Sequence, residues 1–529
     1  MFATIPSAVV EGVDGHAVSV EVHVSRGLPG YTLVGLPDAS CRESRDRVRA
    51  AILSCGLEWP NRRVTINLAP TGLRKHGAAL DLPIALGILV ASGQIDPAAV
   101  APIGAVGELG LDGSIRRVSA LVCLAGAVDA PLVVVPAAGG AEATVVRPEA
   151  VRSAPDLGYL VAALRGEGPP LDDVRPVPDP EPEPTAGDLA EVRGQPLARW
   201  AIEVAAAGGH HLLLVGPPGS GKTMLASRLV GLLPALEPDV ALLVTRIHSA
   251  AGVPIPPGGV VWRPPLRAPH HGASLVSLVG GGTAALRPGE ISCAHGGVLF
   301  LDELGEFAPS ALDALRQPLE EGVVRVTRAA RSATLPADVL LVAAMNPCPC
   351  GEGGAPGRCR CSDAARARYS RRLSGPLLDR FDVRIEVRPP AAHMLLDGPV
   401  EESTAAVAER VARVRGLAAG RGVNGNAALT SAQLDEHAPL TPAAKAVLRQ
   451  ALETGRLTGR GLTRVRTVAR TIVDLLDPGR LEIDDETVAA ALAMRALPVS
   501  VLGGGPAGAG SGDVALVGAA RARMSEVGR

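Results

Sequence analysis

The feature that most constrains this chain is a glycine-rich loop between two apolar runs. Residues 212–215 read Leu-Leu-Leu-Val, and residues 224–230 continue the chain as a predicted helix. The loop between them consists of Gly216, Pro217, Pro218, Gly219, Ser220, Gly221, Lys222 and Thr223. A buried strand, a glycine loop and a helix in this order hold phosphate with successive backbone N–H groups and the positive end of the helix. We therefore expect an α/β domain that binds a nucleoside triphosphate such as ATP.

Side chains in and after the loop predict the chemistry of hydrolysis. Lys222 can reach the β- and γ-phosphates, and the hydroxyl of Thr223 can ligate Mg²⁺. A second apolar run, residues 297–301, ends in Asp302 and Glu303. Asp302 is predicted to hold the Mg²⁺ shell, while Glu303 is predicted to orient and deprotonate the attacking water. A strand that ends in acids is common, but downstream of a phosphate loop the pattern is specific.

Two further polar residues are candidates for the same site. A third predicted strand, residues 338–345, ends at Asn346, whose amide can bridge the γ-phosphate and the water. Arg380 follows a predicted helix and is placed to reach the γ-phosphate of a neighbouring subunit. That role requires an oligomer, because the planar guanidinium must arrive from another chain. A lone arginine is more often surface charge, and only the accompanying motifs favour the catalytic role.

The overall charge and hydropathy limit the partners. The formal net charge is −2, so a nucleic acid would have to be met by a local patch or a lined pore. No uninterrupted apolar run reaches about 18 residues, which predicts no membrane span. The N-terminus, Met1–Pro6, has neither a charged start nor an apolar signal core. We expect a cytoplasmic protein.

The pattern along the chain predicts a multidomain α/β protein. Alternating strands at 17–24 and 62–68, a buried strand at 131–136 and an apolar helix at 79–91 predict an α+β first unit. Prolines alternating with acids predict an extended linker that forms no helix or sheet ladder. A helix with Thr441 as its cap and proline in its first turn belongs to a C-terminal helical unit. The expected ranges are 1–165 for the first unit, 166–188 for the linker, 189–395 for the nucleotide-binding core, 396–500 for the helical unit and 501–529 for a flexible tail.

A basic insertion separates the phosphate loop from Asp302. It is rich in proline and glycine, poor in aromatic residues, and spans residues 263–287. Its basic side chains could follow a phosphate backbone as a pore loop. An equally weighted alternative is a packed insert whose histidines make subunit contacts. The DNA-binding candidates in this segment are Arg263, Arg267, His270, His271 and Arg287.

Four of the eight cysteines form a cluster in the sequence. Cys348 and Cys350 form one C-x-C pair, and Cys359 and Cys361 form a second. Four thiolates at this spacing could close a tetrahedral Zn²⁺ site. The alternative, free thiols that shape a glycine-rich loop beside Asn346, carries equal weight. A disulfide is not expected in a reducing compartment.

Several motifs together resemble a known family. Residues 216–223, 291–303, 315–322 and 346–351 resemble the Mg-chelatase-like AAA+ ATPases. With the first unit before them, the order resembles the ComM/YifB family over about residues 1–500. The resemblance implies an AAA+ core with a helical lid, assembled as a hexameric ring. It also implies a branch-migration helicase that acts on single-stranded or branched DNA in recombination during natural transformation.

The first unit resembles the proteolytic domain of Lon proteases, most clearly at residues 74–81. The nucleophilic serine of that family falls here on Ala79, and its lysine falls on Val122. A serine–lysine dyad needs a hydroxyl and an amine, so this resemblance predicts a fold without protease activity.

The resemblance also implies roles for several arginines. Residues 462–475 resemble the sensor helix of an AAA+ lid, where Arg464 would contact the γ-phosphate, with Arg466 as the second choice. Residues 321–329 read as a hairpin, where Arg325 would touch DNA, with Arg328 as the second choice; a solvated hairpin is the competing interpretation. The alternative function is that of an ATPase subunit in a magnesium-chelatase complex that inserts a metal.

Overall fold

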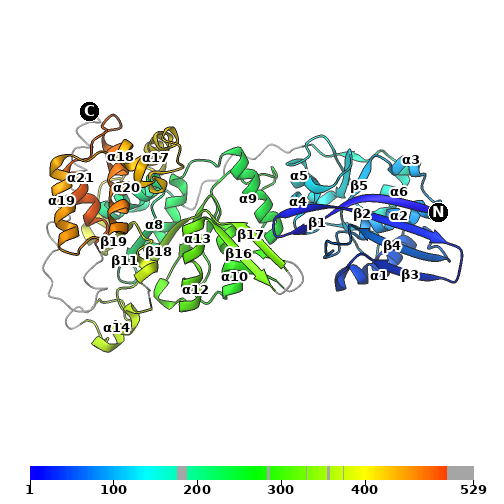
Figure 1. Ribbon diagram of the computed structural model, residues 1–529, viewed down its shortest axis with the longest axis horizontal. Helices are drawn as coiled ribbons and strands as arrows, with labels where there is room; N and C mark the ends of the chain where they lie inside the picture. Colours follow the sequence, from blue (N-terminus) through cyan, green and yellow to red (C-terminus); the bar gives the residue numbers. More distant parts are fainter. Residues whose placement is uncertain (176–186, 283–285, 329–330, 354–357, 373–374, 497–529) are drawn as a thin grey trace.

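A computed structural model describes residues 1–175, 187–282, 286–328, 331–353, 358–372 and 375–496. The expected tail and residues 176–186 of the expected linker lie outside these ranges. The described chain is elongated, with the first unit at one end, a central sheet in the middle and the C-terminal helices at the other end (Figure 1). Among these residues, no helix combines the length and the apolar character that a membrane crossing requires.

The first unit is built around two sheets. In the first sheet, the strand order is β1-β2-β4-β3, and β1 (Phe2–Glu11) pairs antiparallel with β2 (Asp14–Ser25). Helix α2 (Asp81–Ala91) packs on β1 and β2, and all of its residues are buried, as the apolar pattern at 79–91 predicts. The remaining elements before the second sheet are β3 (Gly30–Val34), α1 (Ala39–Ser54), β4 (Arg63–Ala69), α3 (Pro97–Val100), β6 (Glu108–Leu109) and β7 (Ile115–Arg116).

The second sheet has the order β10-β9-β8-β5 and corrects one prediction about the linker. β10 (Asp172–Asp173) pairs antiparallel with β9 (Val151–Ala154), so this part of the expected linker does form a ladder. The prolines lie before it, at 169 and 170, and the N–H groups of both aspartates remain available. An ion pair of 2.8 Å between Arg152 and Asp173 supports the pairing. The other elements are β5 (Ile103–Ala105), α4 (Leu121–Ala127), β8 (Leu132–Pro136), α5 (Gly140–Thr144) and α6 (Leu157–Arg165).

The central core is a five-stranded sheet in the order β12-β15-β18-β11-β19, with all paired strands parallel. The inner strands β15 (Val298–Leu301), β18 (Leu340–Met345) and β11 (Leu212–Val215) are buried throughout. Parallel neighbours end at the same edge of a sheet, so the residues that follow these three strands are brought together.

Helices and a hairpin complete the core. Helix α7 (Pro196–Gly208) begins at Pro196, where proline is favoured in the first turn. A hairpin is present as predicted, but its strands, β16 (Val323–Arg328) and β17 (Arg331–Pro336), extend beyond the predicted range of 321–329. The remaining elements are α8 (Lys222–Leu229), α9 (Pro238–Ala251), β12 (Leu266–Arg267), α10 (Leu275–Val279), β13 (Gly280–Gly281), β14 (Arg287–Pro288), α11 (Glu290–Cys293), α12 (Pro309–Ala314), α13 (Arg316–Glu321), α14 (Asp363–Ser370), α15 (Gly375–Leu378) and β19 (Val383–Glu386).

The C-terminal part of the described chain is helical. In α19 (Pro442–Glu453), the Thr441 hydroxyl accepts a hydrogen bond of 3.2 Å from the backbone N–H of Ala444, which confirms the predicted cap. Helix α20 (Gly459–Leu476) packs against α7 and carries its apolar side toward the core. The other helices are α16 (Ala392–Leu396), α17 (Thr404–Gly420), α18 (Ser431–His437) and α21 (Asp485–Ala493).

The first unit rests on helix α9 of the core. The N–H of Ala120 donates to the Ser249 carbonyl at 2.8 Å, and the N–H of Val122 lies 3.3 Å from the Ser249 hydroxyl. Val122 is fully buried and Ala79 is 7% exposed. Both positions are therefore buried side chains without a reactive group.

A partly buried histidine beside β11 predicts acid sensitivity. His211 is partly buried, and desolvation lowers its pKa to about 4, against an ordinary value of about 6.5. Its Nδ1 lies 3.1 Å from the backbone N of Leu341 and accepts that hydrogen bond in the neutral form. The unfolded chain binds the proton more readily, so stability falls as the pH falls from about 6.5 toward 4.

We expect the free energy of unfolding of the core to drop by about 2 kcal/mol between pH 7 and pH 5 from this residue alone. Denaturant titrations at several pH values measure the effect. The control is His211→Asn, which offers an amide oxygen as acceptor and does not titrate, and it should flatten the slope. An unchanged slope in the variant would contradict the assignment to His211.

Candidate nucleotide-binding site

The phosphate loop connects β11 to α8 as its sequence predicts. Gly219 and Gly221 have φ angles of 75° and 87°, in the left-handed region that favours glycine. A β-carbon on Gly216 would collide with the Val387 carbonyl oxygen. The side chain of Gln195, which sequence reasoning missed, donates to the Ser220 carbonyl at 2.6 Å and braces the loop from the start of α7.

Lys222 connects the loop to the neighbouring strand. Its Nζ lies 2.8 Å from the carbonyl oxygens of both Gly216 and Pro217, and 3.3 Å from Oδ1 of Asn346. Burial lowers the pKa of Lys222, and the charge of Asp302 opposes that shift. The ammonium and the amide at the end of β18 thus lie together, although 124 positions separate them in the sequence.

Thr223 and Asp302 form the second connection across the strand ends. The Thr223 hydroxyl donates to Oδ2 of Asp302 at 2.7 Å. A hydroxyl and a carboxylate are the hard oxygen donors that Mg²⁺ prefers. Their closeness fits a shared Mg²⁺ site.

Glu303 follows Asp302 in a strained conformation and contacts a histidine of the insertion. Its φ angle is 53°, which is rare for a residue other than glycine, and its N–H donates to Oδ1 of Asp302 at 2.8 Å. One carboxylate oxygen lies 2.8 Å from Nδ1 of His271. The rings of His270 and His271 lie in contact, with their centroids 4.0 Å apart and their planes tilted by 35°. His271, predicted as a DNA contact, is therefore engaged with Glu303.

Arg380 and Arg464 are 84 positions apart in the sequence, but they contact each other in the fold. Arg380 pairs with Glu320, and Arg464 pairs with the buried Asp382 and donates to the Arg380 carbonyl at 3.2 Å. Burial would raise the pKa of Asp382, but the nearby His210 ring and the charge of Arg464 lower it below its usual range. In the described part of the chain, neither guanidinium bonds to the phosphate loop.

The surroundings of Arg380 are strongly cationic. Burial lowers its pKa, and the nearby guanidiniums of Arg464, Arg460 and Arg316 lower it further. Its buried Nε has no hydrogen-bond partner among the described residues. Such a cluster favours an anion. Arg466, the second choice for the sensor role, instead pairs with Asp435 at 2.9 Å.

The other predicted DNA contacts divide into two groups. Arg267 makes two hydrogen bonds to Glu290, at 2.6 and 2.8 Å, and is partly buried. Arg325 is exposed but pairs with Glu321. The exposed members are Arg263, His270, Arg287 and Arg325. Residues 283–285 and the side chain of Arg328 lie outside the described part.

The hairpin that carries Arg325 is anchored by its other face. Val324 and Val326 are buried, while Arg325 between them points away from the core. Leu335 of the partner strand lies against Gly12 in the turn between β1 and β2 of the first unit. The hairpin is thus fixed on one side and exposed on the other, rather than solvated all round.

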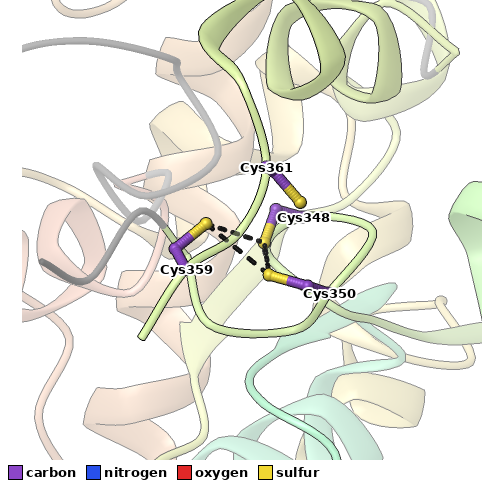
Figure 2. Close-up of side chains that lie close together, drawn as sticks. All are labelled: Cys348, Cys350, Cys359 and Cys361. Atoms are coloured by element: carbon purple, nitrogen blue, oxygen red, sulfur yellow. Dashed lines mark hydrogen bonds between the residues drawn. The ribbon is translucent and has the colours of Figure 1, made fainter. Parts of the chain in front are cut away.

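The four clustered cysteines converge just after Asn346 (Figure 2). The sulfur of Cys348 lies 3.4 Å from that of Cys350 and 3.9 Å from that of Cys359, and the last two sulfurs are 3.6 Å apart. All four sulfurs, that of Cys361 included, lie within 4.8 Å of one another. Hydrogen bonds from the N–H groups of Glu352 and Arg360 lower the pKa of Cys350 to about 6.

Comparisons with known proteins agree with this geometry. Three family models match: "Magnesium chelatase, subunit ChlI" at residues 188–395, "Subunit ChlI of Mg-chelatase" at 20–138, and "Magnesium chelatase, subunit ChlI C-terminal" at 401–495. An uncharacterized protein of Mycobacterium tuberculosis is 45% identical over 92% of this chain and 97% of its own. The uncharacterized protein YifB of Escherichia coli is 42% identical over 88% of this chain and 91% of its own.

The competence protein ComM of Haemophilus influenzae extends the match over nearly the full length. It is 41% identical over 94% of this chain and 97% of its own. The matched regions include the phosphate loop, the strand ends that carry Asp302 and Asn346, and the C-terminal helices. The chain belongs to the Mg-chelatase-like ComM/YifB family of AAA+ proteins.

Proposed function

We propose that this chain hydrolyses ATP and uses the energy to drive branch migration of DNA. One observation carries the proposal of ATP hydrolysis: three parallel strands bring Lys222, Asp302 and Asn346 to one edge of the sheet. The hydroxyl of Thr223, 2.7 Å from Asp302, supplies the remaining oxygen donor. Residues of these types around a phosphate loop are the parts that phosphoryl transfer requires.

Each residue has a distinct task in this proposal. The loop N–H groups and Lys222 hold the phosphates, and Thr223 and Asp302 would hold Mg²⁺. The chemistry that Mg²⁺ would supply there is neutralisation of the negative charge on the phosphate groups. Asn346 orients the attacking water, and Glu303 accepts its proton. His271 restrains the Glu303 carboxylate until the insertion moves.

The site is completed by a second subunit. Within one chain, Arg380 and Arg464 bond to Glu320 and Asp382 instead of the phosphate loop. Their cationic cluster therefore needs an anion from elsewhere, and a triphosphate bound to the neighbouring subunit would supply it. Repetition of this head-to-tail contact closes a ring, which we propose to be a hexamer.

The DNA part of the proposal rests on the insertion and on the family. The insertion presents exposed cationic residues, Arg263 and Arg287, and its histidine reaches Glu303 directly. A phosphate backbone bound by the insertion would thereby be coupled to the hydrolytic residue. The relative from Haemophilus influenzae is named a competence protein, which agrees with DNA recombination during natural transformation.

The test measures ATP turnover of the full chain without DNA, with single-stranded DNA and with four-way junctions. We expect turnover to rise several-fold with junctions, and junctions to be resolved into duplexes as ATP is consumed. Lys222→Ala should abolish both effects, whereas Lys445→Ala, an exposed substitution on α19, should change neither. An active ring that ignores every DNA substrate would refute the DNA motor.

The second candidate function is metal insertion, because the matching family models carry the name of magnesium chelatase over both the first unit and the core. It predicts ATP turnover that depends on a tetrapyrrole and on partner subunits instead of on DNA. Protease activity is not proposed, since Ala79 and Val122 supply no nucleophile and no base.

A further inference from the structure

The four clustered thiols have the geometry of a metal site. In a tetrahedral zinc centre with Zn–S distances of about 2.3 Å, the sulfurs lie about 3.8 Å apart. The measured separations of 3.4, 3.6 and 3.9 Å scatter around that value. A disulfide would need sulfurs about 2.05 Å apart, so these distances do not describe one. The sulfurs of Cys348, Cys350, Cys359 and Cys361 face a common centre in Figure 2.

The polar surroundings also suit thiolates. The backbone N–H of Gly353 donates to the Cys348 sulfur at 3.2 Å. The N–H of Gly351 donates to the Cys348 carbonyl at 2.9 Å, which closes a tight turn between the first two thiols. An N–H group that points at a sulfur favours its anionic, metal-binding form.

The cluster adjoins three parts of the nucleotide site. Cys348 is fully buried and lies two residues after Asn346. Gly351 lies so close to the ring of Pro218 in the phosphate loop that a β-carbon on residue 351 would collide with this ring. The loop of the first thiol pair therefore touches both the strand end and the phosphate loop.

The second thiol pair leads to the turn behind Glu303. Cys361 immediately precedes Ser362, whose hydroxyl caps α14. From that helix region, Arg372 donates to the Gly305 carbonyl at 2.9 Å and contacts Glu306 at 3.0 Å. The four thiols thus lie between segments that contact the end of β18 at Asn346, the phosphate loop at Pro218 and the turn after Glu303.

We propose that Cys348, Cys350, Cys359 and Cys361 bind one Zn²⁺ ion, and that this ion holds Asn346 and the turn after Glu303 in register with the phosphate loop. All-thiolate tetrahedral sets select Zn²⁺ or an iron–sulfur centre, and closed four-ligand zinc sites are structural. The role in catalysis, but not the metal binding itself, rests on the proposed ATPase function.

The first experiment counts metal. The full chain, purified without chelators, should contain one zinc per chain by elemental analysis. The double variant Cys359→Ser/Cys361→Ser should contain none, and Cys55→Ser, a thiol of the first unit, should keep it. Wild-type protein without zinc, with iron and acid-labile sulfide, or with a disulfide among these four residues would overturn the zinc assignment.

The second experiment separates metal binding from its effect on hydrolysis. The double variant should bind ATP with little change in affinity, while kcat falls by about 10²-fold because Asn346 and Glu303 lose their alignment.

If this variant does not fold, a mercurial reagent can release zinc from wild-type protein, and thiol regeneration with added zinc should restore activity. If folded, zinc-free protein hydrolyses ATP at the full rate, the proposed effect of zinc on hydrolysis is refuted, while the zinc site found by elemental analysis still stands. A wild-type protein that binds zinc but hydrolyses no ATP would refute the proposed function and leave the metal site standing.

Discussion

Replacing Arg380 by alanine is expected to lower kcat for ATP hydrolysis by about 10³-fold or more, with little change in ATP affinity. The guanidinium bonds to Glu320 within its own chain and shares a cationic cluster with Arg464. Transfer of Arg380 from Glu320 to the γ-phosphate of a neighbouring subunit would neutralise charge that develops only in the transition state. Single-turnover hydrolysis and nucleotide-binding titrations measure the two parameters separately.

Subunit mixing shows whether Arg380 acts on its own subunit or on the neighbour. Arg380→Ala and Lys222→Ala chains should each be inactive alone. Random mixed rings should recover roughly a quarter of the wild-type rate, because some interfaces then combine an intact loop with an intact Arg380. The control is Arg388→Ala, an exposed arginine paired with Glu386, which should stay near the wild-type rate. Mixed rings without activity would place Arg380 outside the neighbour's site.

The fold was predictable where local patterns decide it. The strand–glycine loop–helix order predicts β11 and α8, and the cap at Thr441 predicts the start of α19. β1 (Phe2–Glu11) was missed, because Pro6 argues against a strand; the sheet tolerates it since β1 is an edge strand. Helix α1 (Ala39–Ser54) was missed because its buried residues are few among many polar ones.

The site was predictable only up to the ends of the strands. Asp302 and Asn346 could be found because each follows an apolar run, and parallel strands end at one edge. The partners of Glu303, Arg380 and Arg464 could not be found in this way. These contacts depend on how the insertion, helix α13 and the C-terminal helices pack in the fold, which no local pattern records.

Glu303→Gln should give a variant that binds ATP and hydrolyses it about 10²–10⁴-fold more slowly, because an amide cannot accept the proton of the attacking water. The substitution keeps the shape of the side chain and the N–H bond of residue 303 to Asp302, 2.8 Å long. ATP should therefore persist on the protein and stabilise the ring. Rapid-quench hydrolysis and light scattering with ATP measure these effects.

His271→Ala is the informative comparison, because it leaves the general base in place and removes only its restraint. The variant lacks the 2.8 Å contact between residue 271 and the Glu303 carboxylate. It should therefore hydrolyse ATP faster in the absence of DNA, and DNA junctions should stimulate its hydrolysis less. His270→Ala removes the neighbouring ring but not the contact of His271 with Glu303, so DNA stimulation should be retained. A His271→Ala chain with a lower basal rate and normal stimulation would show that the histidine positions Glu303 for catalysis. Coupling between DNA and hydrolysis would then have to pass through another part of the insertion.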